Sequence, residues 1–383
     1  GLHVPGLGDA TRTVLRALLP EGCAVGNPVQ LVPWASLEDY VEALRTLVAA
    51  VEVDAVLVII TPPVRDRVQE LAAAVTEHVA SSAKPVLANL LTADGDLTQV
   101  GPLPTFRSPE AAAFALARAA TYAEWRAAPV GRLPELSGVD VVAARLLVDA
   151  ALAEGPGGMW LPVDDAVALL SYVGIGVTVT EVVLDADEAV AEAERLGWPV
   201  ALRPAIVPGP GRRRAWEHLE DPEEVRAAFA EVVAGVGTGS MGEPAAAVVQ
   251  PMVPGGVELE VGVRPDPLFG NLIRLSVGGP SAELIADEAH RTTPLTDVDA
   301  ADLVRALRTA GMLFDGCEGR PAGPAAVEDL LLRVGRLVEE LPEVAELVLE
   351  PVVVTPAGAT VAGARVRLAP WRPGPELALR RLR

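Results

Sequence analysis

The sequence predicts an α/β fold in which a parallel-sheet domain precedes a larger α+β domain. Residues 54–61 (DAVLVIIT) form a continuous apolar run, which is typical of a buried parallel strand. Helical and strand-like segments alternate over residues 1–126, as they do in doubly wound sheets. Beyond residue 138 the strand-like segments are long, typical of antiparallel pairing, and are mixed with helices. These observations favour two domains of different architecture.

The elements of the first domain follow from its hydrophobic periodicity. After its first strand we expect a helix over 64–80, a strand over 84–89 and a closing helix over 108–126. Residues 127–138 are rich in proline and glycine and are typical of a linker. The first domain is therefore placed at 1–126.

The second domain is expected to cover residues 139–370, with a C-terminal tail at 371–383. Asp164 precedes apolar residues at helical spacing, and Asp185 precedes the helical segment 186–196, so both side chains are predicted to cap helices. The other predicted helices cover 139–154, 222–233, 299–310 and 325–340, and the predicted strands cover 177–183, 199–203, 246–250, 256–263, 271–277, 347–354 and 360–367.

Composition and charge exclude several function classes. The formal net charge of −21 over 383 residues argues against a nucleic-acid partner, which requires clustered positive charge. No apolar run reaches the roughly 18 residues of a membrane span, and no signal segment opens the chain, so we expect a cytoplasmic protein without a membrane partner. Cys23 and Cys317 lack the spacing of a metal site. The chain opens without methionine, so a longer parent protein is expected.

Four blocks of sequence carry the strongest functional signal. They are GWPVALRPAI (197–206), VVQPMVPGGVELEVGVRPDPLFG (248–270), VGGPSAELIADEAHRTTPLT (277–296) and LPEVAELVLEPVVV (341–354). In this order the blocks resemble the C-terminal part of the NDP-forming (ADP-forming) acyl-CoA synthetases. The resemblance implies a flavodoxin-like CoA-ligase subdomain over 1–126, followed by an ATP-grasp domain over 139–370.

The resemblance also implies a nucleotide site. The family carries a phosphate-binding lysine on the strand where this chain has Arg203, and a planar guanidinium is not a neutral replacement for an ammonium group. Arg203 is interpreted either as an anion ligand or as the partner of a local carboxylate. The loop PGPGRRRAW (208–216) stands in place of the family's phosphate-covering segment. Its Arg212 and Arg213 are candidate nucleotide ligands, with a solvated basic loop as the alternative.

Further candidate ligands lie in the later blocks. Gln250, Glu258, Gly278 and Gly279 belong to the nucleotide site that the resemblance implies. Glu283 and Glu350 are implied to bind magnesium, for which carboxylate oxygens are suitable ligands. The alternative role of the glycines is structural, because glycine permits close backbone approach.

The end of the chain departs from the family at the implied magnesium ligands. The family has AELDINP, then a second aspartate shortly before an arginine, whereas this chain has AELVLEP and then Gly363 before Arg365. Val348 and Gly363 offer no side-chain oxygen, and Glu318 replaces a family arginine. Magnesium binding is therefore expected to be weak. None of the four histidines lies in a segment like the family's phosphohistidine segment, and His290 is interpreted as structural.

Three functional hypotheses follow. The segment TYAEWRAAPVGRLPEL (121–136) resembles the synthetase-like region of bacterial GNAT-type protein lysine acetyltransferases. The first hypothesis is therefore a non-catalytic or weakly catalytic regulatory module that binds acyl-CoA or another ligand and is fused to, or associated with, a GNAT acetyltransferase. The second is an active ADP-forming ligase subunit that uses ATP and magnesium, beside CoA-binding synthetase domains, to phosphorylate a histidine outside this chain. The third is an assembly scaffold. Association of identical subunits stays open.

Overall fold

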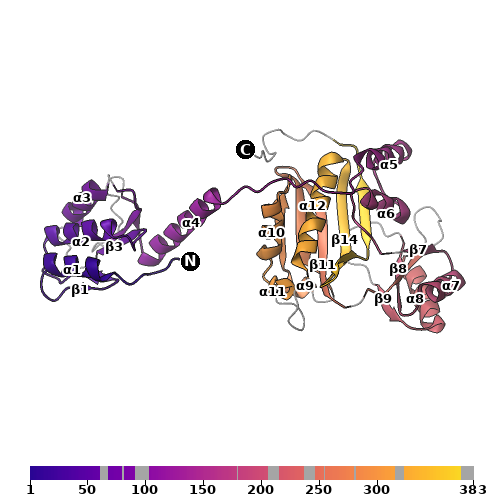
Figure 1. Cartoon of the computed structure of the whole chain (residues 1–383), viewed down its shortest axis with the longest axis horizontal. Coiled ribbons are helices and arrows are strands. Elements are labelled where there is room, and N and C mark those ends of the chain that lie inside the picture. Colours follow the sequence, from indigo (N-terminus) through magenta and orange to yellow (C-terminus); the bar gives the residue numbers. More distant parts are fainter. Residues whose placement is uncertain are drawn as a thin grey trace. The chain divides into compact units, whose positions relative to one another are not determined.

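The computed structural model describes residues 1–60, 68–79, 82–90, 103–178, 180–205, 215–236, 246–253, 255–279, 282–314 and 323–371. Internal contacts divide the chain into two compact units, Gly1–Ala128 and Pro129–Arg383 (Figure 1). The first unit contains a parallel sheet, and the second contains two sheets of antiparallel strands. The mixed α/β architecture expected from the sequence is confirmed.

The first unit is built around three parallel strands. They lie in the order β3 (Val56–Ile60), β4 (Val86–Leu90) and β5 (Thr105–Phe106). The other elements are α1 (Asp9–Leu18), the hairpin strands β1 (Ala24–Val25) and β2 (Val29–Gln30), α2 (Leu37–Ala49), α3 (Val68–Val79) and α4 (Pro109–Ala127). Val56, Ile60 and Ala88 are buried in one core with apolar residues of α1 and α2. The apolar run at 54–61 therefore predicts a buried parallel strand correctly.

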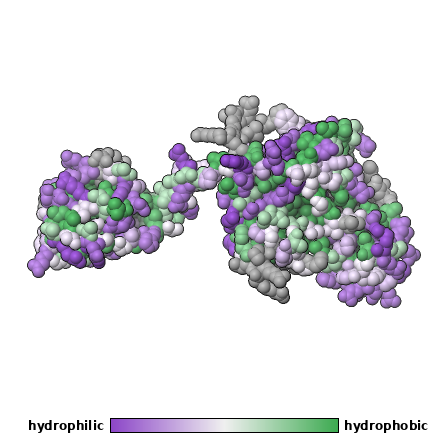
Figure 2. Space-filling model, viewed as in Figure 1, coloured by the Kyte–Doolittle hydropathy of each residue, from purple (hydrophilic) through white to green (hydrophobic). Residues whose placement is uncertain are grey.

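The second unit contains a four-stranded antiparallel sheet. Its strands lie in the order β7 (Glu181–Val183), β10 (Ala247–Pro251), β8 (Val200–Pro204) and β9 (Trp216–Leu219). The helices α7 (Ala186–Leu196) and α8 (Pro222–Val236) share an apolar core with this sheet. The Asp185 carboxylate accepts hydrogen bonds from the amides of Asp187 and Glu188, so its predicted capping role is confirmed. Hydrophilic residues dominate the visible surface over α7 and α8 (Figure 2).

The second unit also contains a seven-stranded sheet. Its strands lie in the order β13 (Glu288–Thr292), β12 (Gly270–Val277), β11 (Val257–Asp266), β14 (Val344–Thr355), β16 (Ala364–Leu368) and β6 (Met159–Trp160), with β15 (Gly358–Val361) paired to β14. The helices of this part are α5 (Val141–Glu154), α6 (Val163–Ser171), α9 (Ala282–Ile285), α10 (Asp297–Ala306), α11 (Gly311–Phe314) and α12 (Pro324–Glu340).

The two faces of the seven-stranded sheet differ in chemistry. Helices α10 and α12 lie along one face (Figure 1). Leu331 of α12 and Leu303 of α10 belong to the same buried core as Val261 and Leu275 of the sheet. The alternate residues of the strands, such as Glu260 of β11, point to the opposite face. The sheet therefore has one apolar, helix-covered face and one face that carries charged side chains.

Several predicted boundaries need correction. Helix α6 begins at Val163 after Pro162, without a side-chain cap, so the prediction that Asp164 caps this helix is wrong. Asp164 instead lies in the first helical turn, where a carboxylate complements the helix dipole. The strand predicted at 360–367 is two strands, β15 and β16. Ala362 and Gly363 are not part of either strand and connect the two. Strand β13 was missed because its sequence EAHRT is polar.

Among the described residues, no helix has the length and apolar character needed to cross a membrane.

Asp287 holds the start of β13 to the loop between α10 and α11. Its side chain is only 3% exposed. Oδ2 accepts hydrogen bonds from the amide and hydroxyl of Thr309 at 2.8 and 2.6 Å, and Oδ1 accepts one from the amide of Arg308 at 3.0 Å. Burial alone would raise the pKa of Asp287, but these hydrogen bonds together lower it.

We expect Asp287→Asn to lower the free energy of unfolding by about 2–3 kcal/mol at pH 7, because the partly buried donors of Arg308 and Thr309 lose a charged acceptor. Because the pKa of Asp287 is lower in the folded than in the unfolded state, ionised Asp287 stabilises the fold at pH values above the unfolded-state pKa of about 3.9. This stabilisation is lost as pH falls below that value toward and through the folded-state pKa. The difference between variant and parent should therefore shrink at pH 3. Urea unfolding at both pH values measures this, with exposed Asp149→Asn as the control. An equal loss at both pH values would contradict the charge argument.

Candidate functional site

Arg203 connects the two sheets of the second unit. It lies on β8, and its Nη1 donates a hydrogen bond to the main-chain oxygen of Glu350 on β14 at 3.2 Å. Its Nη2 lies 3.7 Å from Oε1 of Glu217 on β9, and the side chain is only 16% exposed. The cation that the sequence singled out is therefore enclosed between the sheets and contacts protein oxygens.

The charge of Arg203 is balanced by acidic neighbours. Burial lowers the pKa of the guanidinium, while the carboxylates of Glu217, Glu350 and Glu258 act in the opposite direction. The Nε atom is buried, and no described residue accepts its hydrogen bond. The sequence left two roles for Arg203, an anion ligand or the partner of a local carboxylate. The structure contains a carboxylate partner, Glu217. The unpartnered Nε still leaves one donor for a further acceptor.

Glu258, Gly278 and Gly279 meet at the ends of β11 and β12. The amide of Gly278 donates to the main-chain oxygen of Glu258 at 2.8 Å. A Cβ on Gly278 would lie 3.1 Å from main-chain atoms of Glu258 and Leu259, and Gly279 has a φ of +79°. Only glycine fits such a close, left-handed turn without strain. The glycines thus have a structural role, and this role brings the Glu258 carboxylate beside the turn.

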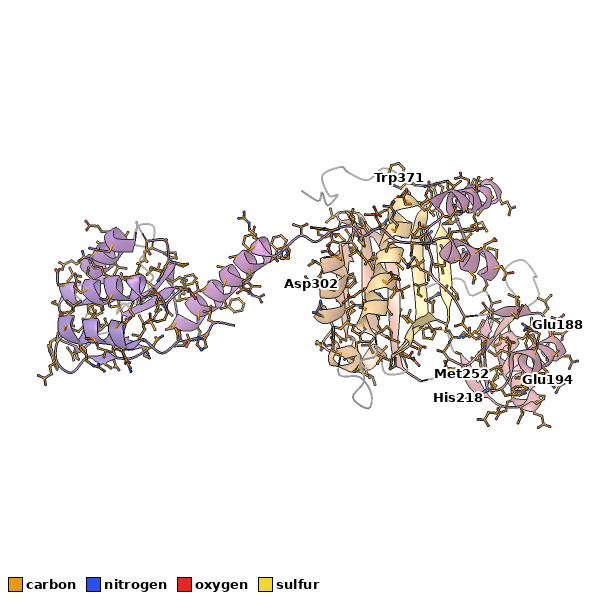
Figure 3. All side chains as sticks on the ribbon, viewed as in Figure 1. Glu188, Glu194, His218, Met252, Asp302 and Trp371 are labelled. Atoms are coloured by element: carbon orange, nitrogen blue, oxygen red, sulfur yellow. The ribbon has the colours of Figure 1, made fainter. Side chains whose placement is uncertain are left out.

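Gln250 shares a sheet face with Arg203. Strand β10 pairs with β8 so that Gln250 lies opposite Ala201 and Val248 lies opposite Arg203. Side chains alternate along a strand, so these four point to the same face. Gln250 is 3% exposed. The chain then leaves β10 through Met252, which is labelled in Figure 3. The Met252 amide donates to the main-chain oxygen of Pro199 at 3.2 Å.

The structure tests the magnesium site that the family resemblance implies. Glu350 lies beside Arg203, but Val348 supplies no oxygen, and a Cβ on Gly363 would overlap the main-chain oxygen of Glu350. Within the described ranges, no cluster of three or more His, Cys, Asp or Glu side chains is arranged to hold a metal ion. Magnesium requires near-octahedral oxygen coordination. Of the implied ligands that the structure describes, Glu258 and Glu350 keep a carboxylate, whereas Val348 and Gly363 offer no side-chain oxygen.

Other predicted ligands cannot be placed. Arg212 and Arg213 fall outside the described residues, as does Glu318, which replaces a family arginine and is not a predicted ligand. Glu283 belongs to α9, but its side chain also falls outside the description. Of the nine candidate ligands, the structure therefore brings together Arg203, Glu258, Glu350 and the two glycines, with Gln250 on the adjoining strand.

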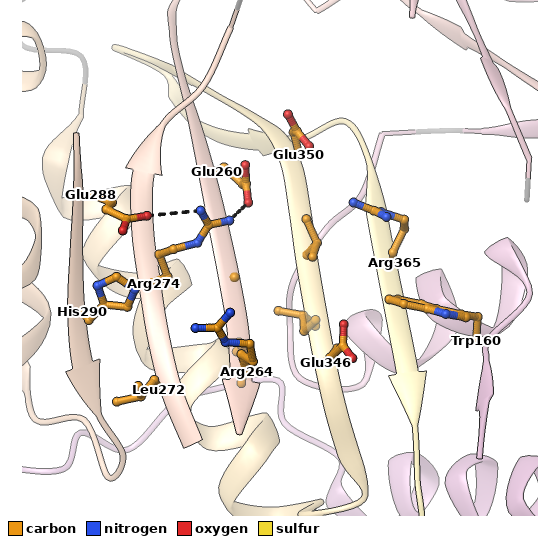
Figure 4. Close-up of a pocket in the computed structure, with 14 residues that line it drawn as sticks. Trp160, Glu260, Arg264, Leu272, Arg274, Glu288, His290, Glu346, Glu350 and Arg365 are labelled. Atoms are coloured by element: carbon orange, nitrogen blue, oxygen red, sulfur yellow. Dashed lines mark hydrogen bonds and ion pairs between the residues drawn. The ribbon is translucent and has the colours of Figure 1, made fainter. Parts of the chain in front are cut away.

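A cavity on the charged face of the seven-stranded sheet escaped the sequence reasoning. Its volume is about 430 Å³, and its lining comes from β6, β11, β12, β13, β14 and β16 (Figure 4). His290 of β13 also lies in this lining. The alternation in ELEVGVR (258–264), where polar or small residues alternate with Leu259, Val261 and Val263, is the signal that predicts such a face.

Comparisons with known proteins agree with this architecture. The model of the ATP-grasp domain family matches residues 150–368. The ADP-forming acetate–CoA ligase I of Archaeoglobus fulgidus is 30% identical over an alignment of 371 positions that covers 92% of this chain and 52% of that protein. The beta subunit of ADP-forming acetate–CoA ligase II of Pyrococcus furiosus is 29% identical over an alignment of 230 positions that covers 58% of this chain and 96% of that subunit.

A solved structure is similar as well. It is the dinucleotide-forming acetyl-coenzyme A synthetase 1 of Candidatus Korarchaeum cryptofilum, in complex with coenzyme A, Ca-AMPCP and HgCl⁺. It is 31% identical with a TM-score of 0.51, covering 57% of this chain and 98% of that one. The chain spans about half the length of the first curated relatives it matches. Because the family model covers more than half of its residues, this chain belongs to the ATP-grasp family, and it is a homologue of the ADP-forming acyl-CoA synthetases.

Proposed function

We propose that this chain is the ATP-grasp part of an acyl-CoA synthetase-like protein that no longer carries out efficient metal-dependent ligation. In this role it binds acyl-CoA or another ligand and regulates a larger protein, for which a GNAT-type protein acetyltransferase is the proposed partner. The position of Arg203 carries the proposal, because its guanidinium is enclosed near three carboxylates.

The electrostatics of the site support this proposal. A cation that is already balanced by Glu217, Glu258 and Glu350 attracts a phosphate group less than an unpaired cation does. Metal-bound nucleotides also need oxygen ligands, and Val348 and Gly363 provide none from their side chains. Two features therefore disfavour the binding of a magnesium-bound nucleotide. The charge of Arg203 is already balanced by carboxylates, and the side chains of Val348 and Gly363 offer no oxygen to the metal.

A second candidate function is an active ADP-forming ligase subunit that phosphorylates a histidine outside this chain. Its ligands would be Arg203, Glu258, Glu283 and Glu350. The observation in its favour is the turn at Gly278 and Gly279, which places the Glu258 carboxylate close to Arg203. The names of the similar proteins, which are ADP-forming CoA ligases, point in the same direction.

Calorimetric titration with ATP separates the two functions. We expect any affinity for ATP to change by less than about threefold when magnesium is added, because the described residues supply no metal cluster. Acetyl-CoA should bind without nucleotide. An increase of about tenfold or more with magnesium, lost in Arg203→Ala, would instead establish the ligase site.

The matched control is Arg226→Ala. Arg226 lies on α8, its side chain is 49% exposed, and it pairs with Asp187 at 3.2 Å on the surface. The substitution removes the same charge as Arg203→Ala without changing the site. A chain that binds neither ATP nor acetyl-CoA would support the assembly scaffold and overturn the regulatory proposal.

A further inference from the structure

Helix α4 of the first unit has two faces with different environments. Ala112 is buried on the face that contacts the strands β3, β4 and β5. Phe114, Tyr122 and Trp125 lie on the opposite face and are 63%, 59% and 70% exposed. From Thr121 onward every residue of the helix is exposed, and these last turns extend beyond the other elements of the first unit (Figure 1). Aromatic residues are only 4% of the chain, so three of them on one open helix face form a concentrated apolar surface.

Aromatic rings and guanidinium groups alternate along this face at every fourth residue. Residues four apart are neighbours on a helix surface, and the row consists of Phe114, Arg118, Tyr122 and Arg126. Cζ of Arg118 lies 5.0 Å from the centroid of the Phe114 ring. Cζ of Arg126 lies 6.0 Å from the centroid of the Tyr122 ring, on which Trp125 stacks with a centroid distance of 5.6 Å. These cation–π and stacking contacts order the side chains of the row within a single chain.

The order of this row is complementary to its own reverse. In the reverse order, each ring is replaced by a guanidinium group and each guanidinium group by a ring. Two α4 helices related by a two-fold axis place their rows side by side in opposite directions, as in the common packing of one i±4 row against another. Phe114 then lies beside Arg126 of the other copy, and Tyr122 lies beside Arg118 of the other copy. Each contact occurs twice, because the two-fold axis repeats it.

We propose that this chain forms a symmetric dimer through the outer face of α4. The dimer covers rings that are exposed in the single chain, and the burial of aromatic surface is favourable. Tyrosine, tryptophan and arginine are the residues that most often dominate the binding energy of protein interfaces. The packing also stabilises the last turns of α4, since helical turns without tertiary contacts are marginal in water.

The dimer does not depend on the proposed function. All of the residues that carry it belong to the first unit, whereas Arg203, Glu258 and Glu350 belong to the second. Dimerisation therefore neither requires nor excludes the binding of nucleotide or acyl-CoA, and either proposal can fail without the other.

Sedimentation equilibrium of the full chain tests the proposal. We expect a monomer–dimer equilibrium with a dissociation constant of roughly 1–100 µM, because the interface is small. Each copy has a formal net charge of −21, so the association should strengthen between about 0.05 M and about 0.5 M NaCl, as screening reduces the repulsion between copies. A chain that stays monomeric at about 200 µM would overturn the proposal. So would a dimer that is about tenfold weaker at the higher salt concentration, because ion pairs with an acidic surface would then hold it together instead of ring contacts.

Substitutions within the row locate the interface. Tyr122→Ala and Arg118→Gln each remove a contact that occurs twice, so each should raise the dissociation constant by at least about tenfold. Trp34→Ala and Arg16→Gln are the matched controls, since both residues are exposed in the first unit outside α4. Melting curves verify that all four variants fold. A dimer that is equally stable in the row variants and in the controls would refute this interface.

A disulfide cross-link tests the antiparallel arrangement. Thr121 and Ala119 are both exposed on α4, but helical spacing places Thr121 on the side of the row and Ala119 on another side of the helix. With Cys23→Ser and Cys317→Ser as the background, Thr121→Cys lies close to the proposed two-fold axis and should form a disulfide-linked dimer on oxidation. Ala119→Cys should stay monomeric in non-reducing electrophoresis. Equal cross-linking of the two variants, or cross-linking of Ala119→Cys alone, would contradict the proposed packing.

Discussion

Replacement of Arg203 by methionine should lower the free energy of unfolding by about 2–4 kcal/mol. Methionine keeps most of the apolar stem but removes the cation near Glu217, Glu258 and Glu350. Loss of one partner from a buried ionic cluster leaves the remaining charges uncompensated, which costs more than the pair contributes. The lower end of the range allows for Glu217, whose side chain is 45% exposed and keeps some hydration.

Salt and a conservative variant separate this effect from lost packing. Repulsion among the remaining carboxylates is screened as ionic strength rises, so the loss in Arg203→Met should be smaller in about 0.5 M NaCl than in about 0.05 M NaCl. These concentrations lie about fivefold above and about twofold below the ~0.1 M at which the screening length is about 10 Å. Arg203→Lys restores the residue of the family and keeps the charge, so it should lose less stability than methionine.

Urea unfolding measures both comparisons, and Arg226→Met serves as the control because Arg226 forms only an exposed ion pair with Asp187. A loss in Arg203→Met that does not depend on salt and is matched by Arg203→Lys would assign the stability to packing of the arginine stem.

Periodicity in the sequence was sufficient to predict much of the fold. The apolar run at 54–61 and the strand-like segments at 246–250 and 256–263 are local signals, and the strands β3, β10 and β11 overlap these predicted ranges. Strand β13 was missed because its burial comes from pairing with β12, not from its own apolar residues. Local pattern identifies an element only where the element carries its own hydrophobic face.

The environment of Arg203 depends on contacts that no local pattern reveals. Glu350 is 147 residues away along the chain, and the two meet only because β8 of one sheet faces β14 of the other. The sequence left an anion ligand and a carboxylate partner as alternatives, since both need the same cation. Trp160 and Arg365 are also far apart in the sequence, so no local pattern indicates that they line the same cavity.

We expect Gly363→Ala to destabilise the protein by about 2–3 kcal/mol, an unusually large effect for the addition of one methyl group. The amide of Glu350 donates to the Gly363 oxygen at 2.9 Å, and a Cβ on Gly363 would overlap the main-chain oxygen of Glu350 and lie 3.0 Å from Nη1 of Arg203. Relief of this overlap requires β14 and β16 to move apart, and both strands carry buried core residues.

Gly157→Ala is the control, because a Cβ there has no neighbour within 4 Å. Urea unfolding of both variants measures the difference.

A second variant, Gly363→Asp, concerns the missing metal ligand, since the family that the sequence resembles has an aspartate where this chain has Gly363. Aspartate brings the same Cβ as alanine before its carboxylate can reach Arg203, so Gly363→Asp should also be destabilised and should not restore magnesium binding. The contrary outcome is that Gly363→Asp is as stable as the parent and binds magnesium. This would show that β14 and β16 can move to accommodate a side chain at residue 363, and that one substitution is sufficient to restore the ligand.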